Sequence, residues 1–233
     1  LAYSPNSVLR VDFDDMFTDV ITDQPLFTGK VLRTLVDGPK TVTEIAAELA
    51  IEKGGRISDA MDRLTEAGLV SPDAGRNPET GADVRERRYR LRDNYARYYL
   101  KLIEPVKEII DSGAYRFTSL SRLEGWQRIM GLAFESLVVN NYVEILPHLH
   151  LGGALVTSAA PYQKRGRRGT TGEGCQIDLL VQTEGTICVV ECKRKKVIDK
   201  DVIQEVDRKV RKIVRPDGVS IRTALVYDGE LSA

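Results

Sequence analysis

The sequence GCQIDLLVQTEGTICVVECKRKK, residues 174–196, predicts two short apolar strands joined by a turn. Glu184 and Gly185 suit the two-residue loop of a β-hairpin. In the register that this loop sets, Asp178 lies directly opposite Glu191. Lys193 follows on the same face, about 7 Å beyond Glu191. The other face of both strands is apolar and carries Ile177, Leu179, Val181, Cys188, Val190 and Cys192.

The two facing acids require compensation, because like charges directly opposite each other destabilise a sheet. A bound divalent cation would provide it, and carboxylates with water and substrate oxygens suit Mg²⁺ or Mn²⁺. Lys193 could then orient the attacking water or stabilise charge on a phosphoryl group. The alternative is an exposed strand end with solvated acids, in which Lys193 pairs with Asp178 or Glu191.

A third carboxylate, Glu135, lies within the apolar stretch GLAFESLVV, residues 131–139. Its neighbours three and four positions away on a helix are small or apolar. We therefore expect Glu135 to point into a packed interface, where an ionised carboxylate needs a metal or a basic partner such as an arginine.

Hydrophobic periodicity and turn residues indicate the elements around this hairpin. Helices are expected within residues 26–38, 41–50 and 56–70, with Thr43 as an N-cap and Gly68 ending the third, followed by a basic strand at 85–91. A bridge that Pro105 kinks or splits precedes a long helix at 121–146. Strands at 153–158 and 221–229 and a helix at 199–214 complete the pattern.

The predicted fold class is α/β, more narrowly α+β: an N-terminal winged helix-turn-helix domain followed by a domain of αβββαβ order. The predicted division of the chain is 1–25 leading segment, 26–91 winged-helix domain, 92–120 helical bridge and 121–233 nuclease-like domain.

The residues of the second domain resemble the PD-(D/E)XK, or restriction-endonuclease-like, nuclease superfamily. A helix Glu, a strand Asp and a Glu-Cys-Lys triplet occur here as Glu135, Asp178 and Glu191 to Lys193. The resemblance implies that these four residues are catalytic and that the three acids hold Mg²⁺ or Mn²⁺. Ile177 replaces the proline of the family motif. Gln204 resembles the start of the family's Q-x-x-x-Y motif, but residue 208 is an arginine.

Nearly the whole chain is similar to the C-terminal region of archaeal and bacterial STAND-type P-loop ATPases, in which a winged helix and a nuclease-like domain of unsettled function follow an ATPase module. The stretches that carry this similarity include YRLRDNYARYYLKLIEP and GWQRIMGLAFE. The resemblance implies an upstream ATPase domain, in agreement with a chain that starts at Leu1. No G-x-x-x-x-G-K-[ST] motif occurs, so ATP hydrolysis by this chain is not expected.

Basic residues predict contacts with DNA, and secondarily with RNA, through phosphate groups. They lie on the third helix, on the basic strand and in the Gly-rich loop before the hairpin: Arg56, Arg63, Arg87, Arg88, Lys164, Arg165, Arg167 and Arg168. Two hypotheses compete with a nuclease. One is a catalytically inactive regulatory or protein-interaction tail of an ATPase, for which Asp178→Ala should raise stability. The other is a DNA-binding regulator that acts through the winged helix alone.

Composition excludes little. The 34 Lys and Arg balance the 34 Asp and Glu, so net charge favours no polyanionic partner. No apolar run is long enough to span a bilayer, and we expect no membrane partner. The three cysteines, with no C-x-x-C pair, favour a reduced, cytoplasmic protein. The sequence leaves a homo-oligomer open.

Overall fold

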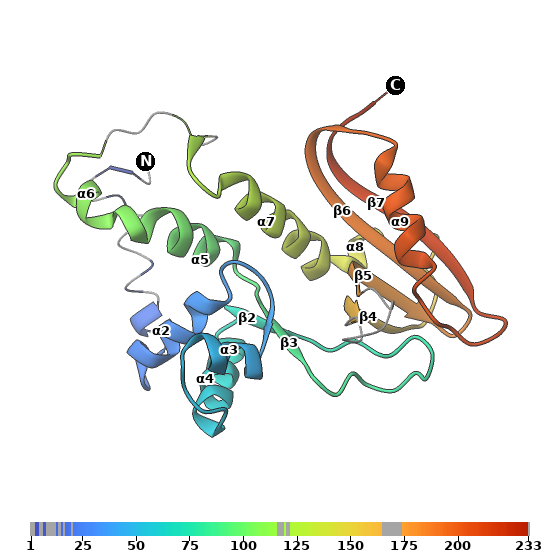
Figure 1. The fold of residues 1–233 in the computed structure, drawn as a ribbon, viewed down its shortest axis with the longest axis horizontal. Coiled ribbons are helices and arrows are strands. Elements are labelled where there is room, and N and C mark those ends of the chain that lie inside the picture. Colours follow the sequence, from blue (N-terminus) through green and yellow to red (C-terminus); the bar gives the residue numbers. More distant parts are fainter. Residues whose placement is uncertain are drawn as a thin grey trace. The chain divides into compact units, whose positions relative to one another are not determined.

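The structure is a computed structural model, and it describes residues 3–4, 7, 13, 15, 17–19, 21–115, 119, 122–164 and 174–232 (Figure 1). The chain divides into two compact units. The N-terminal unit comprises Leu1–Pro72 and Glu86–Ala133, and the C-terminal unit comprises Asp73–Arg85 and Phe134–Ala233. The mixed α and β content agrees with the predicted α+β class.

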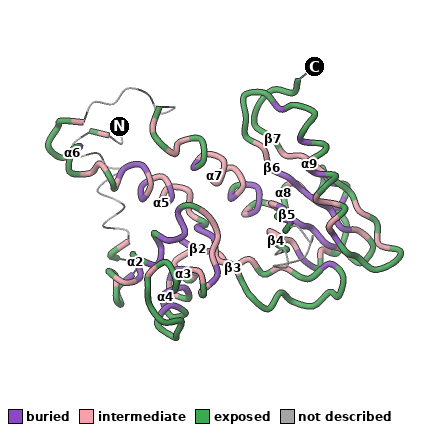
Figure 2. The backbone as a smooth tube through the Cα atoms, viewed as in Figure 1, coloured by how far each residue is buried: buried purple, intermediate pink, exposed green. Residues whose placement is uncertain are grey.

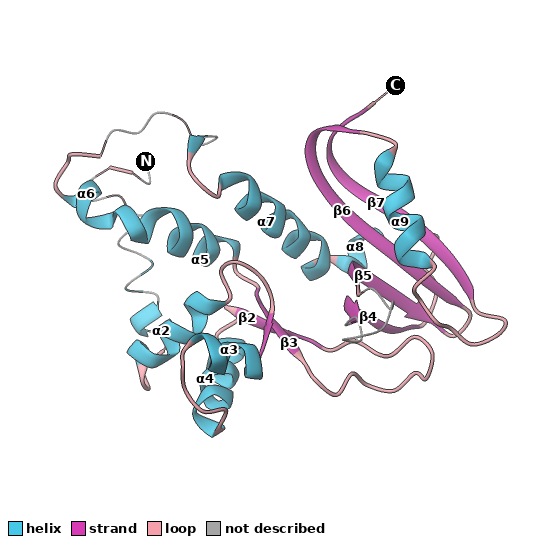
Figure 3. Ribbon diagram, viewed as in Figure 1, coloured by secondary structure: helices cyan, strands magenta, loops and turns pink. Residues whose placement is uncertain are grey.

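The N-terminal unit combines helices with a small sheet (Figure 3). The sheet has the order β1-β3-β2, and β1 pairs antiparallel with β3 through Lys40 and Tyr89. Its elements in chain order are α2 (Pro25–Thr34), β1 (Lys40–Thr41), α3 (Val42–Glu48), α4 (Gly55–Glu66), β2 (Val70–Asp73) and β3 (Arg88–Leu91). The three predicted helices are therefore present, and the basic strand is shorter than predicted.

Local chemistry explains where these helices begin and end. Thr41 caps α3 in a capping box, in which its hydroxyl accepts from the Glu44 amide and the Glu44 carboxylate accepts from the Thr41 amide. The predicted cap at Thr43 is wrong, because only Thr41 has Glu at the third position after it. Gly68 follows α4 with a φ of 72°, the left-handed conformation that favours glycine after a helix.

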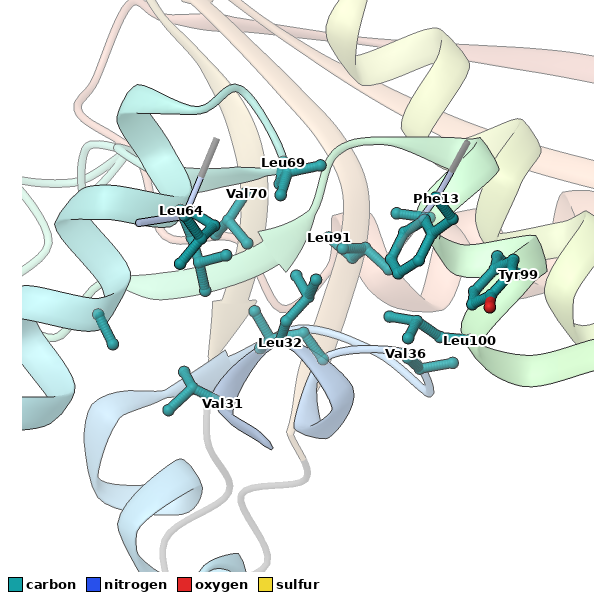
Figure 4. Packing of buried hydrophobic residues seen from close by; sticks show 14 of the residues in the cluster. Phe13, Val31, Leu32, Val36, Leu64, Leu69, Val70, Leu91, Tyr99 and Leu100 are labelled. Carbon is teal, nitrogen blue, oxygen red and sulfur yellow. The ribbon is translucent and has the colours of Figure 1, made fainter. Parts of the chain in front are cut away.

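The core of the N-terminal unit also takes up part of the predicted leading segment (Figure 4). Phe13 and Ile21 are buried, and the Phe13 ring stacks on Tyr99 with 4.2 Å between centroids. Burial of these side chains stabilises the unit by roughly 2 kcal/mol each. Phe13 and Ile21, which were predicted within a leading segment, therefore belong to the core of this unit.

The predicted bridge is helical and irregular. It contains α5 (Asn94–Tyr98), a π-helical segment (Tyr99–Ile103), a 3₁₀ turn (Glu104–Val106) and α6 (Lys107–Asp111). The π-helical segment gives way to the 3₁₀ turn beside Pro105, because proline has no amide hydrogen to continue the helical hydrogen bonding. The predicted helix at 121–146 is two helices, α7 (Trp126–Asn140) and α8 (Tyr142–Ile145), because Asn141 leaves helical geometry at φ −116° and ψ 29°.

The C-terminal unit is built on a four-stranded sheet of order β4-β5-β6-β7. β4 (Val156–Lys164), β5 (Cys175–Thr183) and β6 (Thr186–Ile198) are successively antiparallel. α9 (Asp201–Val210) leads to β7 (Ser220–Leu231), which pairs parallel with β6. This is the predicted αβββαβ order, and the central strands form its buried interior (Figure 2).

Both faces of this sheet carry a core. Val138 and Val139 of α7 pack on the face with Leu179 and Val190. Ile213, just after α9, packs on the other face, whose strand residues include Leu180 and Val189. Val210 of α9 packs on this second face, and Lys209 of α9 contacts Glu191, so α9 covers the face that carries Glu191.

The long segment between β2 and β3 packs on β4 and β5 within the C-terminal unit. The Arg76 amide donates to the Ser158 hydroxyl at 3.3 Å, and the Gln182 amide side chain donates to the Arg76 carbonyl at 2.9 Å. These bonds explain why residues 73–85 group with the C-terminal unit, although the sequence predicted them within the winged-helix domain.

Candidate metal centre

A β-bulge places Asp178 in β5. Ala160 pairs with Leu180 and Tyr162 with Ile177, so Asp178 and Leu179 together oppose Pro161. The bulge reverses the alternation of side chains, and Ile177 packs in the same cluster as Leu180. The prediction that Ile177 shares a face with Leu179 is therefore wrong.

The β5–β6 hairpin has the predicted register, and its paired region ends one residue before Asp178 and Glu191. The ladder runs from Gln182–Ile187 to Leu179–Val190. Asp178 is not Glu191's partner in this ladder, because its Oδ2 atom accepts a hydrogen bond from the Cys192 amide at 2.8 Å. The expected direct cross-strand pair is corrected to two acids at the point where β5 and β6 separate.

Glu191 is the most deeply buried acid of this site, with an exposed fraction of 0%. Its Oε2 atom lies 2.5 Å from the Lys209 ammonium of α9, and its Oε1 atom accepts no hydrogen bond from any described residue. Burial and the nearby Asp178 charge raise the pKa of Glu191 to about 7, against the opposing effects of Lys209 and Lys193. Among the described residues, this oxygen is therefore a buried acceptor with an unused lone pair.

Lys193 and Lys209 share a second acid of α9. The Lys193 ammonium lies 2.9 Å from Glu205 Oε1, and the Lys209 ammonium lies 3.2 Å from the same oxygen. Burial opposes ionisation of Glu205, but the hydrogen bonds and charges of Lys193 and Lys209 outweigh it and lower the pKa of Glu205. We call Asp178, Glu191, Lys193, Glu205 and Lys209 the charge cluster.

Glu135 of α7 is half-buried, as its apolar neighbours predicted. Burial raises the pKa of the Cys192 thiol, and the charges of Asp178, Glu135 and Glu191 raise it further. All three predicted acids thus act on Cys192. However, within the described residues no group of three or more His, Cys, Asp or Glu side chains is arranged to hold a metal ion. The predicted three-acid ligand set remains a prediction.

Glu205 and Lys209 were not predicted. They lie four positions apart on α9, beside the exposed Gln204 and Arg208 that were compared with a family motif. A Glu and a Lys at this spacing are common on solvated helices. The detectable signal was their place in the helix that directly follows the Glu-Cys-Lys strand.

Three of the N-terminal side chains that were predicted to contact nucleic acid already have partners within the N-terminal unit. The Arg56 guanidinium lies 3.9 Å above the Phe27 ring, Arg63 pairs with Asp23, and Arg88 pairs with Glu44 at 2.9 Å. Arg87 is exposed. These contacts reduce the number of side chains that can reach phosphate groups without first breaking an ion pair or stacking contact.

The Gly-rich loop lies largely outside the described residues. Lys164 is exposed, and its ammonium donates to the Lys212 carbonyl at 3.4 Å. The predicted contacts at Arg165, Arg167 and Arg168 fall outside the described ranges.

Comparisons with known proteins give no family. No family model matches the chain, and no curated protein matches it. Among solved structures, the protein VC1899 from Vibrio cholerae is similar with 15% sequence identity and a TM-score of 0.30. The match covers 96% of this chain and 48% of VC1899, so this chain spans about half of that protein. A superposition of this quality does not establish a shared fold. No helix in the described ranges is long and apolar enough to cross a membrane.

The Asp178–Cys192 hydrogen bond gives a first prediction. Asp178→Ala leaves the Cys192 amide without its acceptor, whereas Asp178→Asn keeps an acceptor oxygen and removes the repulsion of Glu191. We expect the alanine variant to be less stable than the asparagine variant by about 1–3 kcal/mol. Urea unfolding followed by far-UV circular dichroism measures this difference. An alanine variant more stable than wild type would instead match the inactive-tail hypothesis.

Proposed function

We propose that the C-terminal unit is a PD-(D/E)XK-type, metal-dependent phosphodiesterase domain that acts on DNA. The observation that carries the proposal is Glu191, which is fully buried, lies beside Asp178 and has one oxygen with no hydrogen-bond partner among the residues that the structure describes. A fold can avoid the cost of such a group with a single apolar substitution, so its presence favours a binding role.

The donor chemistry fits Mg²⁺ or Mn²⁺, because both ions prefer carboxylate oxygens. Asp178 and Glu191 would hold the ion where β5 and β6 separate, and Glu135 would contribute from α7. A bound ion would activate water and polarise a phosphoryl oxygen.

The chain's own groups have separate tasks in this proposal. Asp178 fixes the site on the backbone through the Cys192 amide, which holds the two strands at the splayed position. Lys193 supplies a positive charge at the end of the Glu-Cys-Lys triplet, where it can stabilise charge that develops on the phosphoryl group. Its ion pair with Glu205 orients the ammonium before substrate arrives.

The N-terminal unit would serve as a winged-helix module, and the whole chain as the C-terminal part of a longer, ATPase-linked protein. A specific observation favours a protein-contact role over DNA binding for this module. Arg56, Arg63 and Arg88, which were predicted to contact phosphate groups, have partners within the N-terminal unit.

A cleavage assay tests the enzymatic proposal. Labelled single- and double-stranded DNA, with RNA in parallel, is incubated with Mg²⁺ or Mn²⁺ and either wild type, Lys193→Ala or Lys200→Ala. Lys200 is an exposed lysine next to α9 and is the matched control. We expect Lys193→Ala to lose about 100-fold or more in rate and Lys200→Ala to equal wild type.

Two results would reject the enzymatic proposal: no cleavage by wild type, or equal cleavage by Lys193→Ala. The charge cluster also supports a second candidate, an inactive regulatory domain, because Lys209 already pairs with Glu191. Mn²⁺ binding that disappears in Glu191→Ala, without any cleavage, would identify a metal-binding regulatory domain.

A further inference from the structure

We propose that Lys209 is a built-in counter-ion that closes the carboxylate site and must move from Glu191 to Glu205 before a divalent cation binds. The inference rests on the proposed function and concerns the control of the same site. It makes Lys209 a positioning residue that sets the affinity of the site for metal.

The first step is the position of the Lys209 ammonium. It lies 2.5 Å from Glu191 Oε2, and the Oε1 atom of the same carboxylate has no hydrogen-bond partner within the described ranges. When Glu191 is ionised, an ammonium at this distance compensates its buried charge in the absence of metal. A divalent ion on the same carboxylate would bring two more positive charges close to the ammonium, and this repulsion is strong in a partly buried site.

The second step is that Lys209 has an alternative partner within reach. Glu205 Oε1 is 3.2 Å from the Lys209 ammonium, on the same helix and one turn earlier. A small side-chain rotation can therefore transfer Lys209 from Glu191 to Glu205. The ammonium stays paired during this move, so the free-energy cost is much lower than that of leaving an unpaired charge in the interior.

The third step is the shared use of Glu205. Lys193 lies 2.9 Å from the same oxygen, so Glu205 would hold both lysines once Lys209 has left Glu191. The side chain of Glu205 is 37% exposed and that of Glu191 is 0% exposed. Lys209 therefore moves from the fully buried carboxylate of Glu191 toward the partly exposed carboxylate of Glu205. The Glu191 carboxylate is then available to bind the metal.

The test measures Mn²⁺ affinity by calorimetry and counts only the binding that Glu191→Gln abolishes. Lys209→Met removes the competing charge, and we expect about tenfold tighter Mn²⁺ binding or more. Lys200→Met removes an equal charge beside the same helix at an exposed position and should bind as wild type does.

A second variant, at the partly exposed position 205, should change the Mn²⁺ affinity in the opposite direction. Glu205→Gln removes the alternative partner, so Lys209 stays on Glu191 and Mn²⁺ binding should weaken several-fold. Asp201→Asn, an exposed acid in the first turn of α9, removes the same charge and should have little effect. If Lys209→Met does not fold, this pair alone decides the proposal.

The outcomes separate this proposal from the proposed function. Equal Mn²⁺ affinity in wild type, Lys209→Met and Glu205→Gln would overturn the counter-ion role and leave the metal site standing. Tighter binding by Lys209→Met without any cleavage would support the counter-ion role and reject the nuclease. No Mn²⁺ binding by wild type or any folded variant would overturn both.

Discussion

Replacement of Arg97 by methionine is expected to lower the free energy of unfolding of the N-terminal unit by about 3 kcal/mol or more. Arg97 is 2% exposed in α5. Its guanidinium donates to the Val36 carbonyl at 2.9 Å and to the Leu91 carbonyl at 2.6 Å. Val36 follows α2 and Leu91 ends β3, so one side chain joins the ends of two elements in the core.

The physical reason is the loss of two buried hydrogen bonds from a charged donor. Methionine fills similar space but donates nothing, and each carbonyl deprived of its partner costs about 1–3 kcal/mol. Trp126, the single tryptophan of the chain, packs edge-on against Tyr98 in the same unit, at 6.3 Å between ring centroids. Its fluorescence during urea unfolding therefore reports this unit.

Arg87→Met is the control, because Arg87 is an exposed arginine of the same unit. Its effect should stay within about 0.5 kcal/mol. An Arg97→Met variant that unfolds at the same urea concentration as Arg87→Met would show that the two carbonyl contacts do not stabilise the unit.

The predictions that succeeded depend on local patterns. The Glu184–Gly185 turn predicts the register of β5 and β6, because a two-residue loop leaves little freedom in hairpin pairing. Gly68 marks the end of α4 for a similar reason, since few other residues adopt its positive φ. In both cases a few adjacent residues determine the geometry.

The predictions that failed depend on contacts between distant segments. The bulge at Asp178 is a shift of register opposite Pro161 in the β4–β5 ladder, and hydrophobic alternation along β5 does not reveal it. The partner of Glu191 is Lys209, 18 positions later in the chain. Helical periodicity places Lys209 on the polar side of α9, but only the packing of α9 on the sheet brings it to Glu191.

The pH dependence of stability gives the second large effect. The ordinary pKa of a glutamate side chain is 4.5, and burial with the nearby Asp178 charge raises the pKa of Glu191 to about 7. Between these values the folded protein holds a proton that the unfolded chain releases. Stability that is fully present below pH 4.5 is therefore lost as pH rises toward 7.

The loss should approach roughly 3 kcal/mol, since each unit of pKa difference corresponds to about 1.4 kcal/mol. Glu191→Gln has no proton to lose at this position, so its stability should decline less over the same window. Urea unfolding of both proteins, followed by far-UV circular dichroism at intervals from pH 4.5 to 8, measures the difference.

Glu205 and Asp37 affect the free energy of unfolding at lower pH, and with the opposite sign. Burial opposes their ionisation, but Lys193 and Lys209 lower the pKa of Glu205, and Lys101 does the same for Asp37. Their stabilisation is present above the ordinary pKa and is lost as pH falls through the lowered value. They therefore contribute to acid unfolding in wild type and Glu191→Gln alike. Parallel stability curves for the two proteins between pH 4.5 and 7 would contradict the raised pKa, and would mean that Lys209 keeps Glu191 ionised throughout.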